Sequence, residues 1–224
     1  MSAWPVPAGT ADEAGGLGAP LERGRLAGDS VEVAPWLLNK VMVRCREAGE
    51  PLRAGRIVEV EAYRGESDPA SHARRGWTQR CASMFGPPGH LYVYRIYGMH
   101  CCANVVCGPE GAAGAVLVRA LAPLAGREAM AARRPAARRA ADLANGPGRL
   151  CQALGIDTGH DGIDLLAARS PVLLVDDGTP PPVSPGRSER VGVRHGRRHL
   201  WRWWVPGDPA VSRARPARGG PEAA

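Results

Sequence analysis

Apolar and polar residues alternate most regularly in GRIVEVEAY, residues 55–63. Successive side chains of a strand point to opposite faces, so one face is aliphatic and the other carries Glu59, Glu61 and Tyr63. Such a polar face is either wet or covered by another element. We expect Glu59 to be solvated. For Glu61 both alternatives stand: if the face is covered, a carboxylate beside Tyr63 is partly desolvated and suited to act as a base.

Six further segments have the composition of strands and are bounded by turn residues. They are residues 41–46, 90–98, 101–106, 113–123, 172–178 and 199–205. Gly98 marks a turn between the second and third of these. The segment TPPPVSPGRS, residues 179–188, has the composition of a linker.

Helical features are found in three places. Asp29 or Ser30 is a suitable N-cap for a short helix that ends near Leu38. Residues 127–143 are rich in alanine and arginine and are helix-prone at both ends, with Pro135 interrupting them.

The third helix is predicted in NGPGRLCQALG, residues 145–155, with Asn145 as the cap and Gly155 as the terminator. Its Gly-Pro-Gly start exposes backbone N–H groups that could hold a phosphate, but the segment is too ordinary to name a nucleotide site. The connection over residues 64–89 is long, and loops of that length are usually functional or disordered.

These elements predict one compact domain of the α/β (α+β) class, built around a curved, mainly antiparallel sheet with flanking helices. We place this domain at residues 28–212. Residues 1–27 are rich in Gly, Ala and Pro without periodicity, and we expect them to be disordered, as we do for the C-terminal tail at 213–224.

Composition adds a cationic bias. The 224 residues carry a formal net charge of +7, and Lys40 is the only lysine. Arginine suits phosphates and base edges, although arginine-rich coding alone gives the same excess. No apolar run approaches the ~20 residues of a membrane span, and the first residues lack the features of a secretory signal. We therefore expect a cytoplasmic protein.

The six cysteines form no CxxC pair. His100, Cys101 and Cys102 are adjacent, but consecutive residues of a strand point to opposite faces and do not easily share a metal ion. We expect reduced, mostly buried cysteines, no metal site and no organic cofactor.

The tyrosines gather in one part of the chain. All four tyrosines and the only phenylalanine, Phe85, lie between residues 63 and 97. Two tyrosine faces on neighbouring strands could sandwich a flat ligand, and ordinary strand packing is the alternative.

Two polar residues lie inside apolar strands, and each needs a partner or a role. These are Asn104 and Arg119, and Arg119 could pair with Glu61 across the sheet. The arginines of 127–143, together with those at 74, 75 and 80, either form a solvated face or follow a sugar–phosphate backbone.

Four blocks, in this order and spacing, resemble the 3-methyladenine DNA glycosylase family of the alkyladenine type. They are RIVEVEAYRGESDPASHA (56–73), MFGPPGHLYVYRIYGMHCCANVV (84–106), VLVRALAP (116–123) and NGPGRLCQALGI (145–156). The resemblance extends from about Asp29 to Ser212. It does not extend to the helix-hairpin-helix glycosylases.

The resemblance implies a catalytic pair. Glu61 matches the glutamate that takes a proton from the attacking water, and Arg119 matches the arginine that helps to hold both. A main-chain carbonyl within RVGV (190–193) also holds the water in the family, and the sequence leaves open which one.

The resemblance also implies the substrate contacts. Tyr63 and Tyr94 match the tyrosines that stack on the two faces of the extruded base, and His72 closes the pocket and offers its main-chain amide to the base edge. Tyr97 matches the residue that intercalates into the gap left in the DNA. Asn104 matches the position that clashes with the exocyclic amine of guanine.

The function thus implied is excision of alkylated purines of the 3-methyladenine and 7-methylguanine class from double-stranded DNA. We expect a monomer that works in base excision repair at the nucleoid. Cleavage of the backbone through a Schiff base needs an amine, and the single Lys40 lies away from the tyrosines, so we expect a monofunctional enzyme that leaves an abasic site. The alternatives are a non-enzymatic nucleic-acid-binding module and a metal-dependent hydrolase using His72, His100 and the cysteines.

Overall fold

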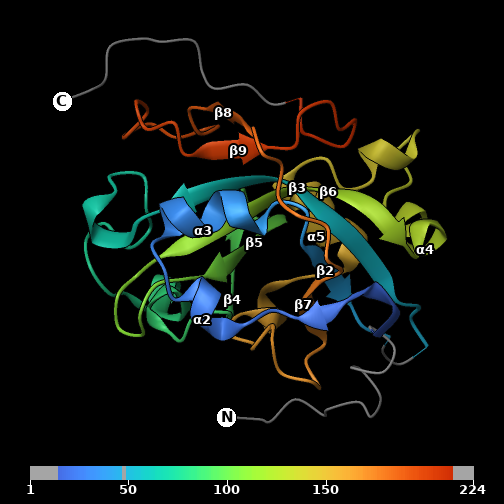
Figure 1. Cartoon of the computed structure of the whole chain (residues 1–224), viewed down its shortest axis with the longest axis horizontal. Helices are drawn as coiled ribbons and strands as arrows, with labels where there is room; N and C mark the ends of the chain where they lie inside the picture. The colour runs from blue at the N-terminus through green and yellow to red at the C-terminus, as the bar shows by residue number, and fades with distance from the viewer. Residues whose placement is uncertain (1–14, 47–48, 214–224) are drawn as a thin grey trace.

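A computed structural model describes residues 15–46 and 49–213 (Figure 1). Its strands are β1 (Ala19–Pro20), β2 (Val41–Arg44), β3 (Arg53–Tyr63), β4 (Leu91–Ile96), β5 (His100–Val106), β6 (Ala115–Ala125), β7 (Val172–Asp176), β8 (Gly186–Ser188) and β9 (Arg202–Trp204). Its α-helices are α2 (Arg23–Leu26), α3 (Ser30–Leu37), α4 (Arg127–Arg133) and α5 (Pro147–Leu154). Short 3-10 turns are η1 (Gly15–Leu17), η2 (Gly65–Ser67), η3 (Gln79–Phe85), η4 (Ala140–Asp142) and η5 (Thr158–His160).

The strands form one curved sheet in the order β1-β7-β2-β3-β6-β5-β4, and every pairing in it is antiparallel. β9 joins by pairing with β3, and β8 pairs with β9. The predicted single domain with a curved, mainly antiparallel sheet and flanking helices is confirmed. None of the helices in the described ranges is long and apolar enough to cross a membrane.

β3 is the central strand. One of its edges pairs with β6 along most of its length, while the other pairs first with β2 at residues 53–56 and then with β9 at residues 59–61. The register with β6 is irregular around Val58, which packs in a separate apolar cluster from Val60 and Ala62. The polar end of β3 therefore has a strand on each side.

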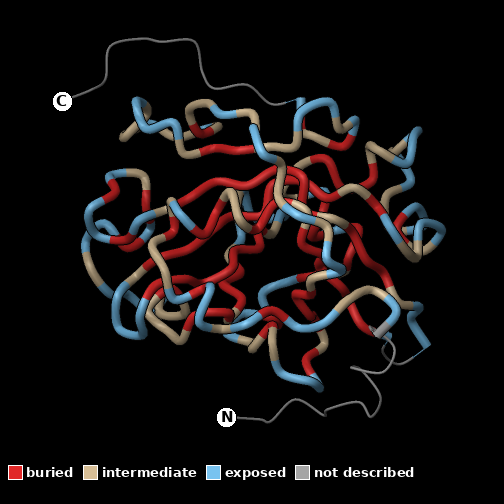
Figure 2. The backbone as a smooth tube through the Cα atoms, in the orientation of Figure 1, coloured by how far each residue is buried: buried red, intermediate tan, exposed pale blue. Residues whose placement is uncertain are grey.

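The main core lies between the sheet and two helices. Leu37 of α3 and Leu150 and Leu154 of α5 pack with the apolar face of β3, β5 and β6. Figure 2 shows the buried backbone concentrated in the sheet, with the exposed segments in the connections around it. This packing places the opposite, polar face of β3 toward the loops that follow β3 and β8.

The helix ends follow the sequence in part. The Asp29 side chain accepts a hydrogen bond from the backbone N–H of Val31, as predicted, and Gly155 ends α5 in the left-handed conformation. The predicted cap at Asn145 is wrong: the N-cap is Gly146, which has no side chain, and the Asn145 amide instead binds Asp142 and Arg149.

Two other predictions need correction. Residues 15–27 are not disordered as predicted, since they contain η1, β1 and α2 and bury Leu21 and Leu26. Residues 1–14, and the predicted tail beyond Arg213, lie outside the described residues. The linker predicted at 179–188 contains β8, where an added Cβ on Gly186 would lie 2.1 Å from the Trp204 ring.

Gly65 holds the turn after β3 and gives a stability prediction. Its φ is +70°, and a Cβ there would lie 2.1 Å from the Ala113 carbonyl oxygen. Gly65→Ala should lower the free energy of unfolding by more than about 2 kcal/mol, from backbone strain plus a steric clash. Urea denaturation measures this.

Gly111→Ala is the matched control. Gly111 has a φ of +90° but nothing within 4 Å of the added Cβ. It should cost only the left-handed strain, about 1–2 kcal/mol. Equal losses in the two variants would contradict the contact with Ala113.

Candidate active site

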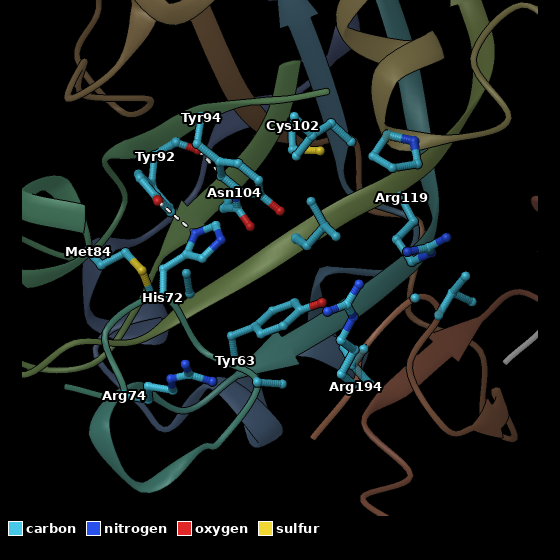
Figure 3. A pocket seen from close by; sticks show the side chains of 18 of the residues that line it. Tyr63, His72, Arg74, Met84, Tyr92, Tyr94, Cys102, Asn104, Arg119 and Arg194 are labelled. Atoms are coloured by element: carbon cyan, nitrogen blue, oxygen red, sulfur yellow. Dashed lines mark hydrogen bonds between the residues drawn. The ribbon is translucent and has the colours of Figure 1, made fainter. Parts of the chain in front are cut away.

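A cavity of about 530 Å³ opens beside the polar end of β3 (Figure 3). Most of its lining comes from the end of β3, the loop at 69–74, the β4–β5 hairpin, the first half of β6 and the loop at 191–195, and Met84 and Pro147 complete it. The tyrosine cluster seen in the sequence therefore lines a cavity that the sheet and two loops share.

Glu61 is fully buried and contacts three residues that line this cavity, Tyr63, Arg119 and Val191. Its Oε1 accepts a hydrogen bond from the backbone N–H of Val191 at 2.7 Å and is 3.1 Å from Nη1 of Arg119. Its Oε2 accepts one from the hydroxyl of Tyr63 at 3.0 Å. The two hydrogen bonds and the ion pair fix the orientation of the carboxylate, which has about four acceptor positions and can still accept from a further donor.

Arg119 bridges two carboxylates. Its Nε donates to Oε1 of Glu59 at 2.9 Å while its Nη1 faces Glu61, which confirms the predicted pairing across the sheet. Burial disfavours the guanidinium charge, but the carboxylates of Glu61 and Glu59 outweigh it, and the pKa of Arg119 is raised above its ordinary value. Arg119 is thus a permanent cation beside Glu61.

The prediction that Glu59 is solvated is wrong. Glu59 is fully buried and accepts hydrogen bonds from Arg119, from Nε of Arg202 at 2.7 Å, and from the backbone N–H and hydroxyl of Ser212 at 2.7 and 2.9 Å. Arg202 lies on β9, the strand that covers this edge of β3. The sequence predicted a strand there without indicating that it pairs with β3.

Three aromatic rings form one wall. The His72 ring is edge-on to the Tyr94 ring at a centroid distance of 4.4 Å, and its Nδ1 is hydrogen-bonded to the hydroxyl of Tyr92 at 2.9 Å. The rings of Tyr92 and Tyr94 are 5.4 Å apart. Tyr63 forms another part of the lining, from β3. Burial raises the pKa values of the three tyrosines, so their hydroxyls remain protonated donors at neutral pH.

His72 is exposed to the cavity, yet its pKa is lowered, first by desolvation and second by the positive charge of Arg80. The imidazole therefore remains neutral at neutral pH. A neutral ring beside Tyr94 adds no positive charge to the cavity.

Asn104 and Tyr97 both line the cavity. The amide nitrogen of Asn104 donates to the Tyr92 carbonyl at 3.0 Å, which fixes a buried side chain that lines the cavity. Tyr97, at the tip of the β4–β5 hairpin, is 89% exposed and has a φ of +49°. It projects from the cavity rim.

The arginines divide into two groups. Arg74 and Arg194 are exposed and line the cavity. In the 127–143 segment, Arg133 pairs with Glu50 and Arg139 with Asp142, as on an ordinary solvated surface.

The cysteines are free, and five of the six are buried. Within residues 15–46 and 49–213 no three His, Cys, Asp or Glu side chains are grouped so as to hold a metal ion. His72 lines the main cavity, whereas His100 lines a different one with Cys101 and Cys151.

Two contacts escaped the sequence reasoning. One is the hydrogen bond from the Val191 amide. Almost every residue has a backbone N–H, so the sequence does not mark this one as a donor, although it does point to the RVGV segment. The other is an ion pair between Asp68 and Arg190. These two residues are 122 positions apart and lie in segments without periodicity, so no local signal marks them.

Comparison with known proteins gives a consistent result. Residues 25–209 match the family described as "Methylpurine-DNA glycosylase (MPG)". Three relatives carry the name "Putative 3-methyladenine DNA glycosylase". The one from Burkholderia cenocepacia (strain HI2424) is 54% identical over 84% of this chain and 88% of its own length. Those from Streptomyces avermitilis and Chlorobaculum parvum are 49% and 46% identical, over 86% and 83% of this chain and 91% and 87% of their own lengths.

The lowered pKa of His72 predicts a pH effect on stability. An unfolded histidine titrates near about 6.5, so the unfolded state takes up this proton before the folded state does as the pH falls. The wild type should lose stability below that pH relative to His72→Gln, measured by urea denaturation between pH 8 and pH 5. Arg80→Gln, which removes a charge that disfavours protonation, should reduce the effect. A stability difference that is constant with pH would contradict the prediction.

Proposed function

The chain belongs to the methylpurine-DNA glycosylase family, and we propose that it excises alkylated purines of the 3-methyladenine and 7-methylguanine class. It is a DNA glycosylase, an enzyme that hydrolyses N-glycosidic bonds. The observation that carries the proposed mechanism is the buried Glu61 carboxylate, held by two hydrogen bonds and an ion pair to residues that line an aromatic cavity.

In this mechanism Glu61 accepts a proton from the water that attacks C1′ of the extruded nucleotide. Arg119, Tyr63 and the Val191 amide hold the carboxylate, which can still accept a hydrogen bond from that water. Of the residues in RVGV, Val191 contacts Glu61 through its main chain, so its carbonyl is the one we assign to the water. An alkylated purine is already cationic and a good leaving group, so one base suffices and no separate acid is required.

The cavity walls suit a flat, cationic base. Tyr63 and Tyr94 approach from different strands and would stack on its two faces, with about 1–3 kcal/mol per stacked base offsetting the cost of extrusion. The electron-rich faces of tyrosines favour a positive ring. The fixed amide of Asn104 would clash with the exocyclic amine of normal guanine, and Tyr97 would fill the gap in the duplex.

We propose that the enzyme is monofunctional and leaves an abasic site. Nζ of Lys40 is 2.6 Å from a carboxylate oxygen of Asp176 and lies over the Trp36 ring, and only 5% of this side chain is exposed. It is therefore not placed to form a Schiff base with a sugar in the cavity. We also propose that the enzyme acts as a monomer on nucleoid DNA.

Glu61→Gln separates the enzyme from a non-enzymatic binding module. The variant should release 7-methylguanine from a duplex at least about 100-fold more slowly, because the general base is lost, and should still bind that duplex. Single-turnover base release and a gel-shift assay measure these. Glu66→Gln changes an exposed glutamate of the next loop and should leave both unchanged. Base release at the wild-type rate by Glu61→Gln would rule out the assignment of Glu61.

The arginines at the rim predict the salt dependence of binding. Arg194→Ala should reduce the slope of log K against log salt concentration by about 0.9, as expected for one lost phosphate contact. Arg56→Gln is the control, because Arg56 pairs with Asp177 at the opposite end of β3 from Tyr63. A slope that is unchanged in Arg194→Ala would show that Arg194 does not contact the backbone.

A further inference from the structure

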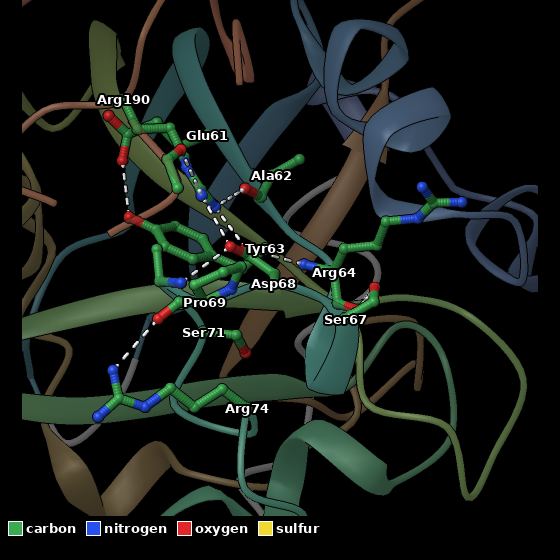
Figure 4. A network of polar contacts seen from close by, with 12 residues as sticks. Glu61, Ala62, Tyr63, Arg64, Ser67, Asp68, Pro69, Ser71, Arg74 and Arg190 are labelled. Atoms are coloured by element: carbon green, nitrogen blue, oxygen red, sulfur yellow. Dashed lines mark hydrogen bonds and ion pairs between the residues drawn. The ribbon is translucent and has the colours of Figure 1, made fainter. Parts of the chain in front are cut away.

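The Asp68–Arg190 ion pair is completely buried beside the cavity, with both side chains inaccessible to solvent (Figure 4). The pairing is bidentate: Nη1 is 2.5 Å from Oδ2 and Nη2 is 2.8 Å from Oδ1. Nη1 also donates to the Ala62 carbonyl at 2.8 Å. The pair thus joins β3, the loop after it and the segment that follows β8.

The guanidinium of Arg190 lies between two aromatic rings. Its central carbon is 4.7 Å from the centroid of the Tyr63 ring and 5.1 Å from that of Trp201. A ring has two faces, and Arg190 covers one face of Tyr63. The other face is the one left to stack on a base in the cavity.

Arg190 also adjoins the second donor to Glu61. Val191 follows it directly in the chain and donates its backbone N–H to Glu61, while the Tyr63 hydroxyl donates to the other carboxylate oxygen. Both hydrogen bonds to Glu61 therefore come from residues next to Arg190, one in the chain and one through its ring.

Asp68 also holds the loop at residues 69–74, which carries His72. Its carboxylate accepts hydrogen bonds from the backbone N–H groups of Arg64 and Ala70. Ala70 is two residues before His72, which lines the cavity wall opposite Tyr63 in Figure 3. The same carboxylate thus holds the loop that carries His72.

We infer that Asp68 and Arg190 are positioning residues for base excision. Arg190 holds the Tyr63 ring and the Val191 amide in place, and Asp68 fixes Arg190 and the loop of His72. This inference rests on the proposed function. It assigns the pair an effect on the rate of excision, because a misplacement of about 1 Å near the reacting atoms costs up to about 100-fold.

Asp68 also balances the positive charge of Arg190. A lone guanidinium behind Tyr63 would reduce the attraction of that ring for a cationic base. Because Asp68 is paired with Arg190 through both oxygens, the ion pair beside the Tyr63 ring carries no net charge. A lysine in place of Arg190 would keep the charge pair but would lack the planar guanidinium that contacts both rings.

Arg190→Lys is the primary test. In single-turnover assays with a duplex containing one 7-methylguanine, the variant should release the base about 10- to 100-fold more slowly. Its affinity for the same duplex should change much less, and circular dichroism should show it folded at the assay temperature. Arg56→Lys, which alters the bidentate pair with Asp177 at the other end of β3, should keep the wild-type rate.

A second variant tests the inference if Arg190→Lys does not fold. Asp68→Asn combined with Arg190→Gln removes both charges and leaves no unpaired ion, and the shorter side chain does not fill the space between the rings. It should also fold and excise about 10- to 100-fold more slowly. If both variants failed to fold, the pair would belong to folding and the inference would be overturned.

The outcomes separate the two proposals. A wild type that binds the duplex but releases no base would overturn the proposed function and this inference with it. An active wild type accompanied by a folded Arg190→Lys of equal rate would overturn the positioning role alone. A rate that falls only in proportion to the folded fraction or to DNA binding would do the same.

Discussion

Two glutamates buried on the same face of β3 impose the constraint on which the rest of the site depends. An unpaired carboxylate in such a place costs several kcal/mol. Arg119 of β6 lies between Glu59 and Glu61, and Arg202 of β9 completes the balance, so two negative charges face two positive ones. The arginines come from the strands on either side of β3. The charges around Glu61 are therefore balanced only when β6 and β9 are both paired with β3.

The groups that hold Glu61 come from elements of different rigidity, and this explains the need for further support. Arg119 belongs to a long central strand, whereas the Val191 amide belongs to a loop without regular structure. Strands hold side chains more closely than loops do, and a reaction centre tolerates little displacement. The buried pair of Asp68 and Arg190 joins that loop to β3, so it gives the loop side of the cavity a fixed point that backbone hydrogen bonding alone does not provide.

The sequence predicted the features that depend on short stretches of the chain, such as strands and turns. The alternation in 55–63 located β3, and the pairing of Arg119 with Glu61 follows because β3 and β6 are long enough to be recognised. The roles at the cavity came from the family resemblance. The burial of Glu59 was missed because it depends on β9 lying beside β3, and Arg190 was missed because its partner lies far away in an aperiodic loop. β8 has only three residues, too few for a period to appear.

The net charge of +7 does not distinguish arginines that pair with buried carboxylates from arginines that are exposed at the cavity. Arg119, Arg190 and Arg202 are buried as partners of carboxylates, while Arg74 and Arg194 are exposed at the cavity. Arginine keeps its charge when buried, whereas a buried lysine readily loses its proton and becomes a nucleophile. A site compensated by arginines alone can hold a charged base next to a sugar without offering an amine to attack it. The same choice of cation that stabilises the buried carboxylates therefore agrees with the proposed monofunctional reaction, in which base release stops at the abasic site.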